Sequence, residues 1–221
     1  MNKELKVSPS IAAGNLMRLE DEVRKLEASG ADSIHFDVMD GHFVPLLTIG
    51  VPFIEQMRKL TQMHLDVHIM VTNPDQVFLD YLNAGADTLS FHIECAAHAH
   101  RICAKIKEAN KRVGIALNPS THWKDIEYLL TELDQVTIMT VNPGFSRQAH
   151  LSFVHKKIME LSQYRKQNNL NFEIQVDGGV THENSGLLQN LGANIVVAGG
   201  AVFNYPNYKE AIQRIKNVSS N

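Results

Sequence analysis

Short runs rich in β-branched residues alternate with amphipathic stretches along the whole 221-residue chain. The runs are typical of buried strands, and apolar residues three and four positions apart are typical of covering helices. A helix that follows a strand returns the chain to the same edge of a sheet, so the strands are expected to be parallel. The expected strands lie at 5–11, 33–38, 65–71, 88–93, 112–117, 136–141, 172–177 and 194–199, and the clearest helices at 16–29, 75–85, 99–110, 153–167 and 208–218.

Eight repeats of strand and helix in a chain of this length predict an α/β fold, a closed (β/α)₈ TIM barrel. A doubly wound open sheet is the alternative, but its Gly-x-Gly-x-x-Gly signature is missing, because the first strand is followed by AAGNLMRL. No linker or low-complexity tract interrupts the pattern. Residues 1–221 are therefore expected to form a single barrel domain.

The composition excludes several classes of partner. The formal net charge is -3 and no run of Lys or Arg occurs, which argues against binding to nucleic acid or to an acidic membrane surface. No segment reaches the roughly 18 apolar residues of a membrane span. The N-terminus lacks a signal peptide, and two cysteines, Cys95 and Cys103, are too few for a disulfide framework. We expect a cytoplasmic protein.

Two connections are longer than the rest, one at 39–52 and one at 142–150. Long ordered loops are usually functional. Both follow strands, so in a barrel both lie at the C-terminal face, where active sites are built.

Ionisable side chains stand at strand positions that normally hold apolar residues: His35 and Asp37 in one strand, His68 in the next, and Asp177 at the end of the seventh. His35 and Asp37 point to the same face because side chains alternate along a strand, and a buried carboxylate needs a compensating partner. Two imidazoles and two carboxylates meeting at the barrel mouth would hold one divalent ion, such as Zn²⁺, Fe²⁺, Mn²⁺ or Co²⁺. Asp66 lies nearer the start of its strand, where a role in stability is expected.

Glycine pairs follow the last two strands: Gly178 and Gly179 in VDGGV, and Gly199 and Gly200 in VAGGA. Loops at these two places commonly form the phosphate site of a barrel, because glycine lets backbone N–H groups approach the oxygens. Either pair alone is compatible with a simple tight turn. Both together indicate a phosphorylated ligand.

A second group of potential ligands lies in FHIECAAHAHRIC, comprising His92, Glu94, Cys95, His98, His100 and Cys103. Its spacing matches no familiar zinc site, and a helix starting near residue 97 would carry the later histidines on its polar face. We do not expect a separate metal site here.

These motifs, in this order and spacing, resemble the ribulose-phosphate 3-epimerase family, including its relatives that act on allulose 6-phosphate. The resemblance runs nearly end to end, through SPS, HFDVMDGHFVP, LDVHIMV, FHIE, ALNP, MTVNPGF, VDGGV and VAGGAVF. It implies a ribulose-phosphate-binding barrel and a homo-oligomer. The implied reaction converts D-ribulose 5-phosphate to D-xylulose 5-phosphate, with D-allulose 6-phosphate epimerisation as the alternative.

The resemblance also implies the role of each site residue. His35, Asp37, His68 and Asp177 would hold the metal, and Asp37 and Asp177 would be the acid/base pair. Removing a proton from one face of a carbon beside a ketone and returning one to the other needs two carboxyls. The implied substrate contacts are Ser10, His68, Met39, Met70, Met139, Gly144, Phe145, Ser146, Arg147, Gly178, Gly179, Gly199 and Gly200.

The chain departs from the family pattern in the loop after the sixth strand, where GFSRQ replaces the usual GFGGQ. Ser146 and Arg147 therefore stand in place of two glycines. A guanidinium contact to phosphate and a solvent-facing Arg147 are both compatible with the sequence. The usual AGSA is AGGA here, and Leu46 replaces a common Asn.

Two rival functions are weaker. Sugar-phosphate decarboxylases with similar barrels carry an Asp-x-Lys-x-x-Asp strand motif, and Schiff-base aldolases need a lysine at a strand end. Neither is present here, because HFDVMD contains no lysine. A non-catalytic sugar-phosphate-binding barrel would be expected to lose Asp37 or Asp177. Both are present, so catalysis is favoured.

Overall fold

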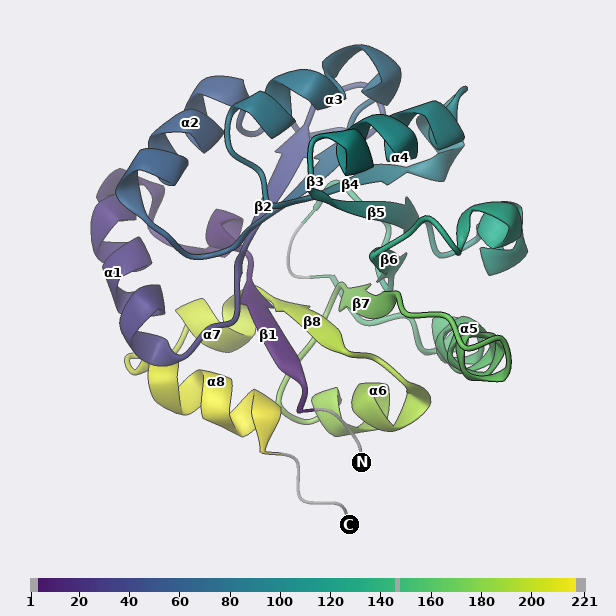
Figure 1. Cartoon of the computed structure of the whole chain (residues 1–221). Coiled ribbons are helices and arrows are strands. Elements are labelled where there is room, and N and C mark those ends of the chain that lie inside the picture. Colours follow the sequence, from purple (N-terminus) through teal and green to yellow (C-terminus); the bar gives the residue numbers. More distant parts are fainter. Residues whose placement is uncertain (1–3, 146–147, 218–221) are drawn as a thin grey trace.

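The computed structural model describes residues 4–145 and 148–217. Eight parallel strands form one sheet in the order β1-β8-β7-β6-β5-β4-β3-β2, which curls into a barrel (Figure 1). A parallel bridge between Ser10 and His35 spans the remaining gap between β1 and β2. The predicted TIM barrel is confirmed. Its strands are β1 Lys6–Pro9, β2 Ile34–Met39, β3 Leu65–Met70, β4 Thr88–His92, β5 Arg112–Leu117, β6 Gln135–Met139, β7 Glu173–Asp177 and β8 Ile195–Ala198.

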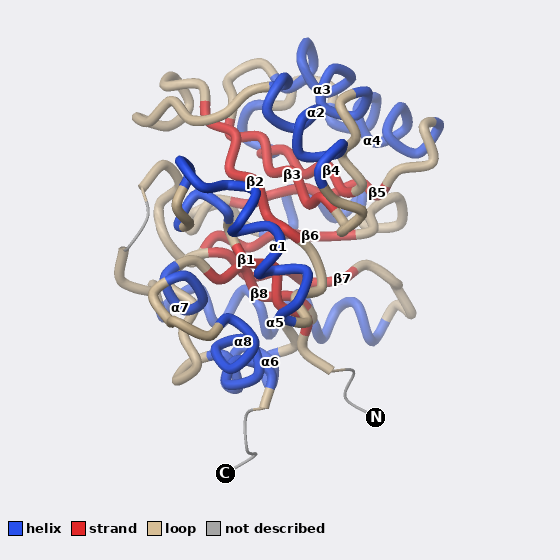
Figure 2. The backbone as a smooth tube through the Cα atoms, turned by 90° about the vertical axis from the view of Figure 1, so that its left-hand side faces the viewer, coloured by secondary structure: helices blue, strands red, loops and turns tan. Residues whose placement is uncertain are grey.

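Helices surround the strands on the outside, as Figure 2 shows. Pro52 in the first turn of α2 fits a helix start, because proline lacks the N–H that a first turn leaves unpaired. Gly30 ends α1 with a left-handed φ of 80°. The helices are α1 Leu19–Ser29, α2 Val51–Leu60, α3 Pro74–Asn83, α4 Ala99–Glu108, α5 His155–Gln167, α6 Ser185–Leu191, α7 Gly200–Phe203 and α8 Tyr208–Lys216.

One repeat differs from the expected strand and helix unit. The connection from β5 to β6 contains a 3₁₀ helix at Trp123–Leu129 instead of an α-helix. This 3₁₀ helix takes seven residues of a connection that runs from 118 to 134. Trp123 is buried and covers the barrel there.

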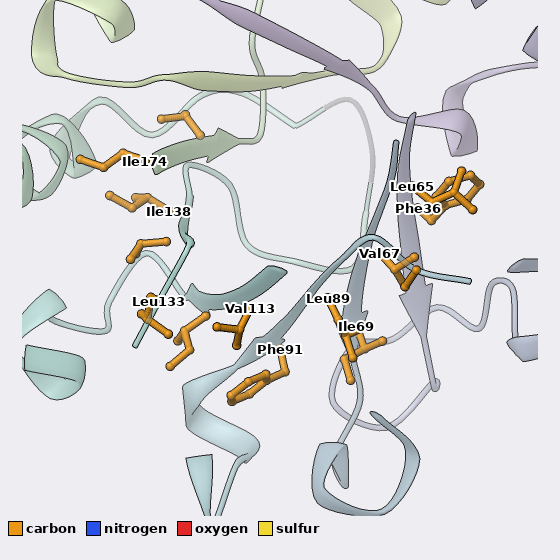
Figure 3. Packing of buried hydrophobic residues seen from close by; sticks show 14 of the residues in the cluster. Phe36, Leu65, Val67, Ile69, Leu89, Phe91, Val113, Leu133, Ile138 and Ile174 are labelled. Atoms are coloured by element: carbon orange, nitrogen blue, oxygen red, sulfur yellow. The ribbon is translucent and has the colours of Figure 1, made fainter. Parts of the chain in front are cut away.

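Alternation within the strands separates the two sides of the barrel wall. In β3, Leu65, Val67 and Ile69 are fully buried and belong to the apolar cluster between strands and helices (Figure 3). Fully burying such a side chain contributes about 1.5–3 kcal/mol. The intervening residues Asp66 and His68 therefore point into the barrel.

The barrel interior holds a hydrogen-bonded polar network. Thr137 Oγ1 donates to Gln175 Oε1 at 2.9 Å, and Gln175 Nε2 donates to Asp66 Oδ2 at 2.6 Å. Gln135 Nε2 also donates to Gln175 Oε1, at 3.0 Å. Because each of these buried polar groups has a partner, the network stabilises the interior that lies beneath the strand ends.

Among the described residues, the helices include none that is both long enough and apolar enough to cross a bilayer.

Candidate active site and metal centre

The four predicted ligands come together inside the barrel. His35 and Asp37 lie on β2, His68 on β3 and Asp177 at the end of β7, and one ligand atom of each lies within 4.8 Å of the others. His35 Nε2 is 3.4 Å from Asp37 Oδ1 and 3.7 Å from Asp177 Oδ2. His68 Nδ1 is also 3.7 Å from Asp177 Oδ2. Among the described residues, 92–103 contribute no further group of three or more potential ligands this close together.

The donor atoms fit a divalent cation. The rings of His35 and His68 are fully buried, yet His35 Nε2 and His68 Nδ1 have no hydrogen-bond partner. An unpaired buried polar atom costs about 1–3 kcal/mol, so a ligand is expected to use these lone pairs. Ligands at about 2.0–2.2 Å from an ion in a tetrahedron are about 3.3–3.6 Å apart, close to the separations here.

Asp66 orients His35. Its Oδ2 lies 2.8 Å from His35 Nδ1, which directs His35 Nε2 toward the carboxylates of Asp37 and Asp177. Burial lowers the pKa of His35, but the carboxylates of Asp37 and Asp66 outweigh burial and hold the pKa well above its usual value. Asp66 thus takes part in the site, whereas the sequence indicated only a role in stability. Its place on the same face as His68 was the available signal.

His68 is supported from its other side by two residues that the sequence did not connect to it. His68 Nε2 lies 3.0 Å from His92 Nε2, and His92 Nδ1 lies 3.1 Å from Glu94 Oε2. Burial lowers the pKa of His92 to about 4, so this ring is neutral near pH 7. Burial would raise the pKa of Glu94, but hydrogen bonds from His92 and Thr121 lower it to about 2.

Ser10 lies beside Asp37. Its Oγ donates to Asp37 Oδ2 at 2.5 Å. Burial would raise the pKa of Asp37, but the charge of His35 and the hydrogen bonds that Asp37 accepts lower it to about 2. Asp37 is therefore a carboxylate at neutral pH and can accept a proton.

Three methionines lie at strand ends on the inward face. Met39 pairs with Met70 across β2 and β3, and Met139 pairs with Asp177 across β6 and β7. Met70 and Met139 are buried. They place apolar, polarisable surface beside the four ligands.

Of the two glycine pairs, the one after β7 has the left-handed backbone that favours glycine. Gly178 and Gly179 have φ of 123° and 63°, a region that other residues rarely adopt. A Cβ on Gly179 would lie 2.9 Å from the backbone N of His150, so the loops after β6 and β7 are in close contact. Gly199 precedes α7 and Gly200 begins it.

The loop after β6 also approaches the loop after β2. A Cβ on Gly144 would lie 2.8 Å from Pro45 Cδ, and the Phe145 side chain is exposed. Ser146 and Arg147 lie outside the described residues.

Known proteins match the chain over nearly its whole length. The sequence profile of the ribulose-phosphate 3-epimerase family matches residues 6–203. A ribulose-phosphate 3-epimerase from Synechocystis is 43% identical over 98% of this chain and 95% of its own. A chloroplastic ribulose-5-phosphate-3-epimerase from Arabidopsis thaliana is 44% identical over 95% of this chain and 75% of its own.

Solved structures agree on the fold. The crystal structure of KGPDC from Streptococcus mutans superposes with a TM-score of 0.68 at 14% identity, covering 97% of both chains. At this identity the likeness is one of architecture alone.

Proposed function

Because the chain belongs to the ribulose-phosphate 3-epimerase family, we propose that it interconverts D-ribulose 5-phosphate and D-xylulose 5-phosphate through Asp37 and Asp177. The observation that supports this most directly is the meeting of two carboxylates, from β2 and β7, with two unpartnered imidazole nitrogens. A protein that only binds sugar phosphates would have no need of two largely buried carboxylates facing one small site.

The two carboxyls divide the proton transfer between the two faces of the substrate. One carboxylate removes the proton from the carbon beside the ketone, which leaves a planar enediolate, and the other carboxyl returns a proton to the opposite face. The ionised state of Asp37, which accepts the hydrogen bond from Ser10, suits it to removing the proton. The roles exchange in the reverse reaction.

His35, Asp37, His68 and Asp177 are the residues that would hold one divalent ion per chain. When bound, such an ion supplies Lewis-acid stabilisation of negative charge that develops on the substrate oxygens. Asp66 holds His35 in the orientation that this requires. Zn²⁺, Fe²⁺, Mn²⁺ and Co²⁺ all suit two imidazoles and two carboxylates.

The remaining site residues would bind the rest of the substrate. Backbone N–H groups of the glycine loops are suited to the phosphate, and the methionines to the carbon chain. The proposed phosphate contacts are Gly144, Phe145, Gly178, Gly179, Gly199 and Gly200, and the proposed contacts to the sugar are Ser10, His68, Met39, Met70 and Met139. A homo-oligomeric assembly, a cytoplasmic location and a single domain over 1–221 stay predictions.

Epimerase assays in deuterated water, with one metal ion at a time, test this proposal. The purified protein, stripped of metal and reloaded with each of the four ions, should convert D-ribulose 5-phosphate and label the carbon beside the ketone. D-allulose 6-phosphate under the same conditions tests the hexulose alternative, and it should react with a much lower kcat/KM. A higher kcat/KM for the hexulose phosphate would contradict the proposed substrate, and failure with both would contradict epimerisation.

A further inference from the structure

The residues behind His68 form a line of three side chains that ends at a carboxylate. His68 Nε2 is 3.0 Å from His92 Nε2, and His92 Nδ1 is 3.1 Å from Glu94 Oε2. The ring planes of His68 and His92 are inclined by 25° to each other, with centroids 5.0 Å apart. His92 is fully buried, and the ring of Phe43 from the loop after β2 contacts it with centroids 4.7 Å apart. The line is thus fixed in place on both sides of His92.

The hydrogen-bond chemistry of this line allows one arrangement of protons that suits a metal ligand. A carboxylate only accepts, so His92 Nδ1 must carry the hydrogen that faces Glu94. A neutral His92 then has a bare Nε2, which accepts the Nε2 hydrogen of His68. His68 in turn keeps a lone pair on Nδ1, the atom that faces Asp177 at 3.7 Å.

The opposite arrangement would block the site. If His92 carried its hydrogen on Nε2, it would donate to His68 Nε2, and a neutral His68 would carry its hydrogen on Nδ1. An imidazole nitrogen that bears hydrogen cannot ligate a metal. The tautomer of His92 therefore decides whether His68 can act as a ligand.

We propose that Glu94 and His92 are positioning residues that fix the Nε2–H tautomer of His68 and so create its metal-binding Nδ1. The inference rests on the proposed metal site. It makes His68 the counterpart of His35, which the carboxylate of Asp66 orients directly at 2.8 Å. The two histidines offer different nitrogens, Nε2 from His35 and Nδ1 from His68, and each has its own carboxylate behind the other nitrogen.

The two carboxylate oxygens of Glu94 have different partners, so one substitution can change the contact to His92 and leave the other contacts in place. Its Oε1 accepts from the backbone N–H of Asn118 at 2.8 Å and from Thr121 Oγ1, while Oε2 faces His92. In Glu94→Gln the amide oxygen can keep both Oε1 contacts. The amide NH₂ then faces His92 Nδ1, and because it donates, it favours the blocking tautomer.

Metal binding measured by titration of the metal-free protein with Mn²⁺ tests the proposal. Glu94→Gln should weaken Mn²⁺ affinity about 10–100-fold, the usual effect of removing a partner behind a ligand. Thr121→Val, which removes a contact to Oε1 and leaves Oε2 untouched, should change affinity by less than about threefold, since it spares the line to His68. Equal losses in both variants would mean that Glu94 acts only by anchoring the loop 118–122, and would overturn the proposal.

A double-substitution cycle shows whether Glu94 affects Mn²⁺ binding through His92 or independently of it. His92→Phe should weaken Mn²⁺ binding on its own, and adding Glu94→Gln to it should cause no further loss. Additive losses would overturn the proposal. Should His92→Phe fail to fold, the ¹⁵N spectrum of wild-type His92 is the substitute, expected to show a hydrogen on Nδ1 and none on Nε2. The reverse pattern would overturn it.

A His68→Ala variant distinguishes failure of this inference from failure of the metal site itself. If His68→Ala loses Mn²⁺ affinity while Glu94→Gln keeps it, the positioning role of Glu94 and His92 is wrong, while the metal site is supported. If His68→Ala binds as tightly as wild type, the metal site is misassigned and both proposals fall.

Discussion

His35 Nε2 and His68 Nδ1 face the same small space without a hydrogen-bond partner, and each is expected to supply one metal ligand. His35→Ala or His68→Ala should reduce bound metal well below one ion per chain, because losing one of four ligands removes much of the binding free energy. Metal analysis after dialysis, with circular dichroism to verify folding, measures this. His100→Ala, on the exposed face of α4, is the matched control and should retain its metal. Full occupancy in both active-site variants would refute the ligand assignment.

Asp37 and Asp177 are expected to serve opposite faces of the substrate, so replacing either by Asn should lower kcat by about 10²–10⁴-fold. Each variant should still exchange the hydrogen beside the ketone with deuterated solvent for one epimer, the one whose hydrogen faces the remaining carboxylate. Mass spectrometry of recovered sugar phosphates measures this exchange. Asp80→Asn on the exposed surface of α3 should behave as wild type. Exchange of both epimers in one variant would argue for a single base.

At the scale of elements, the loop after β7 depends on a glycine backbone. Gly179→Ala places a side chain at φ 63° and within 2.9–3.0 Å of three His150 atoms, so the loops after β6 and β7 must separate. We expect KM for the sugar phosphate to rise more than kcat falls, since the displaced backbone N–H groups are those proposed to bind phosphate.

Gly30→Ala is the matched control for that substitution. Gly30 also has a positive φ, 80°, but nothing lies within 4 Å of its added Cβ, and it ends α1 away from the site. Both variants should lose about 1 kcal/mol of unfolding free energy from the left-handed backbone. An equal rise in KM for both would show that the Gly179 effect is one of stability and not of phosphate binding.

The elements were largely predictable from the sequence because the signals for them are local. Alternation in β2 and β3 indicated which residues point inward, and so His35, Asp37 and His68 were found together. The roles of His92 and Glu94 depend on the register between β3 and β4. This register sets His68 opposite Ser90, which lies two residues before His92 on the same face of β4. No local pattern encodes that register. The 3₁₀ helix between β5 and β6 was missed because eight equal repeats were assumed.

For the whole molecule, metal binding, protonation and stability should be linked through His35. In the metal-free protein burial lowers the pKa of His35, but the carboxylates of Asp37 and Asp66 outweigh burial and hold the pKa well above its usual value, which favours a proton on the ring. A raised pKa stabilises the fold below the unfolded value and this contribution is lost as pH rises through the folded pKa. A metal ion must displace that proton, so its affinity rises with pH, up to about tenfold per pH unit for one proton.

Stabilisation by a ligand grows with its concentration relative to Kd, so the rise in Tm caused by a fixed Mn²⁺ concentration should be larger at pH 8 than at pH 6. Thermal unfolding at pH 6, 7 and 8, with and without Mn²⁺, measures this. In His35→Asn the displaced proton is absent, so the rise in Tm should be smaller and its dependence on pH flatter. If the wild-type rise were the same at every pH, metal binding would release no proton from the site, and the link between His35 and the metal would be wrong.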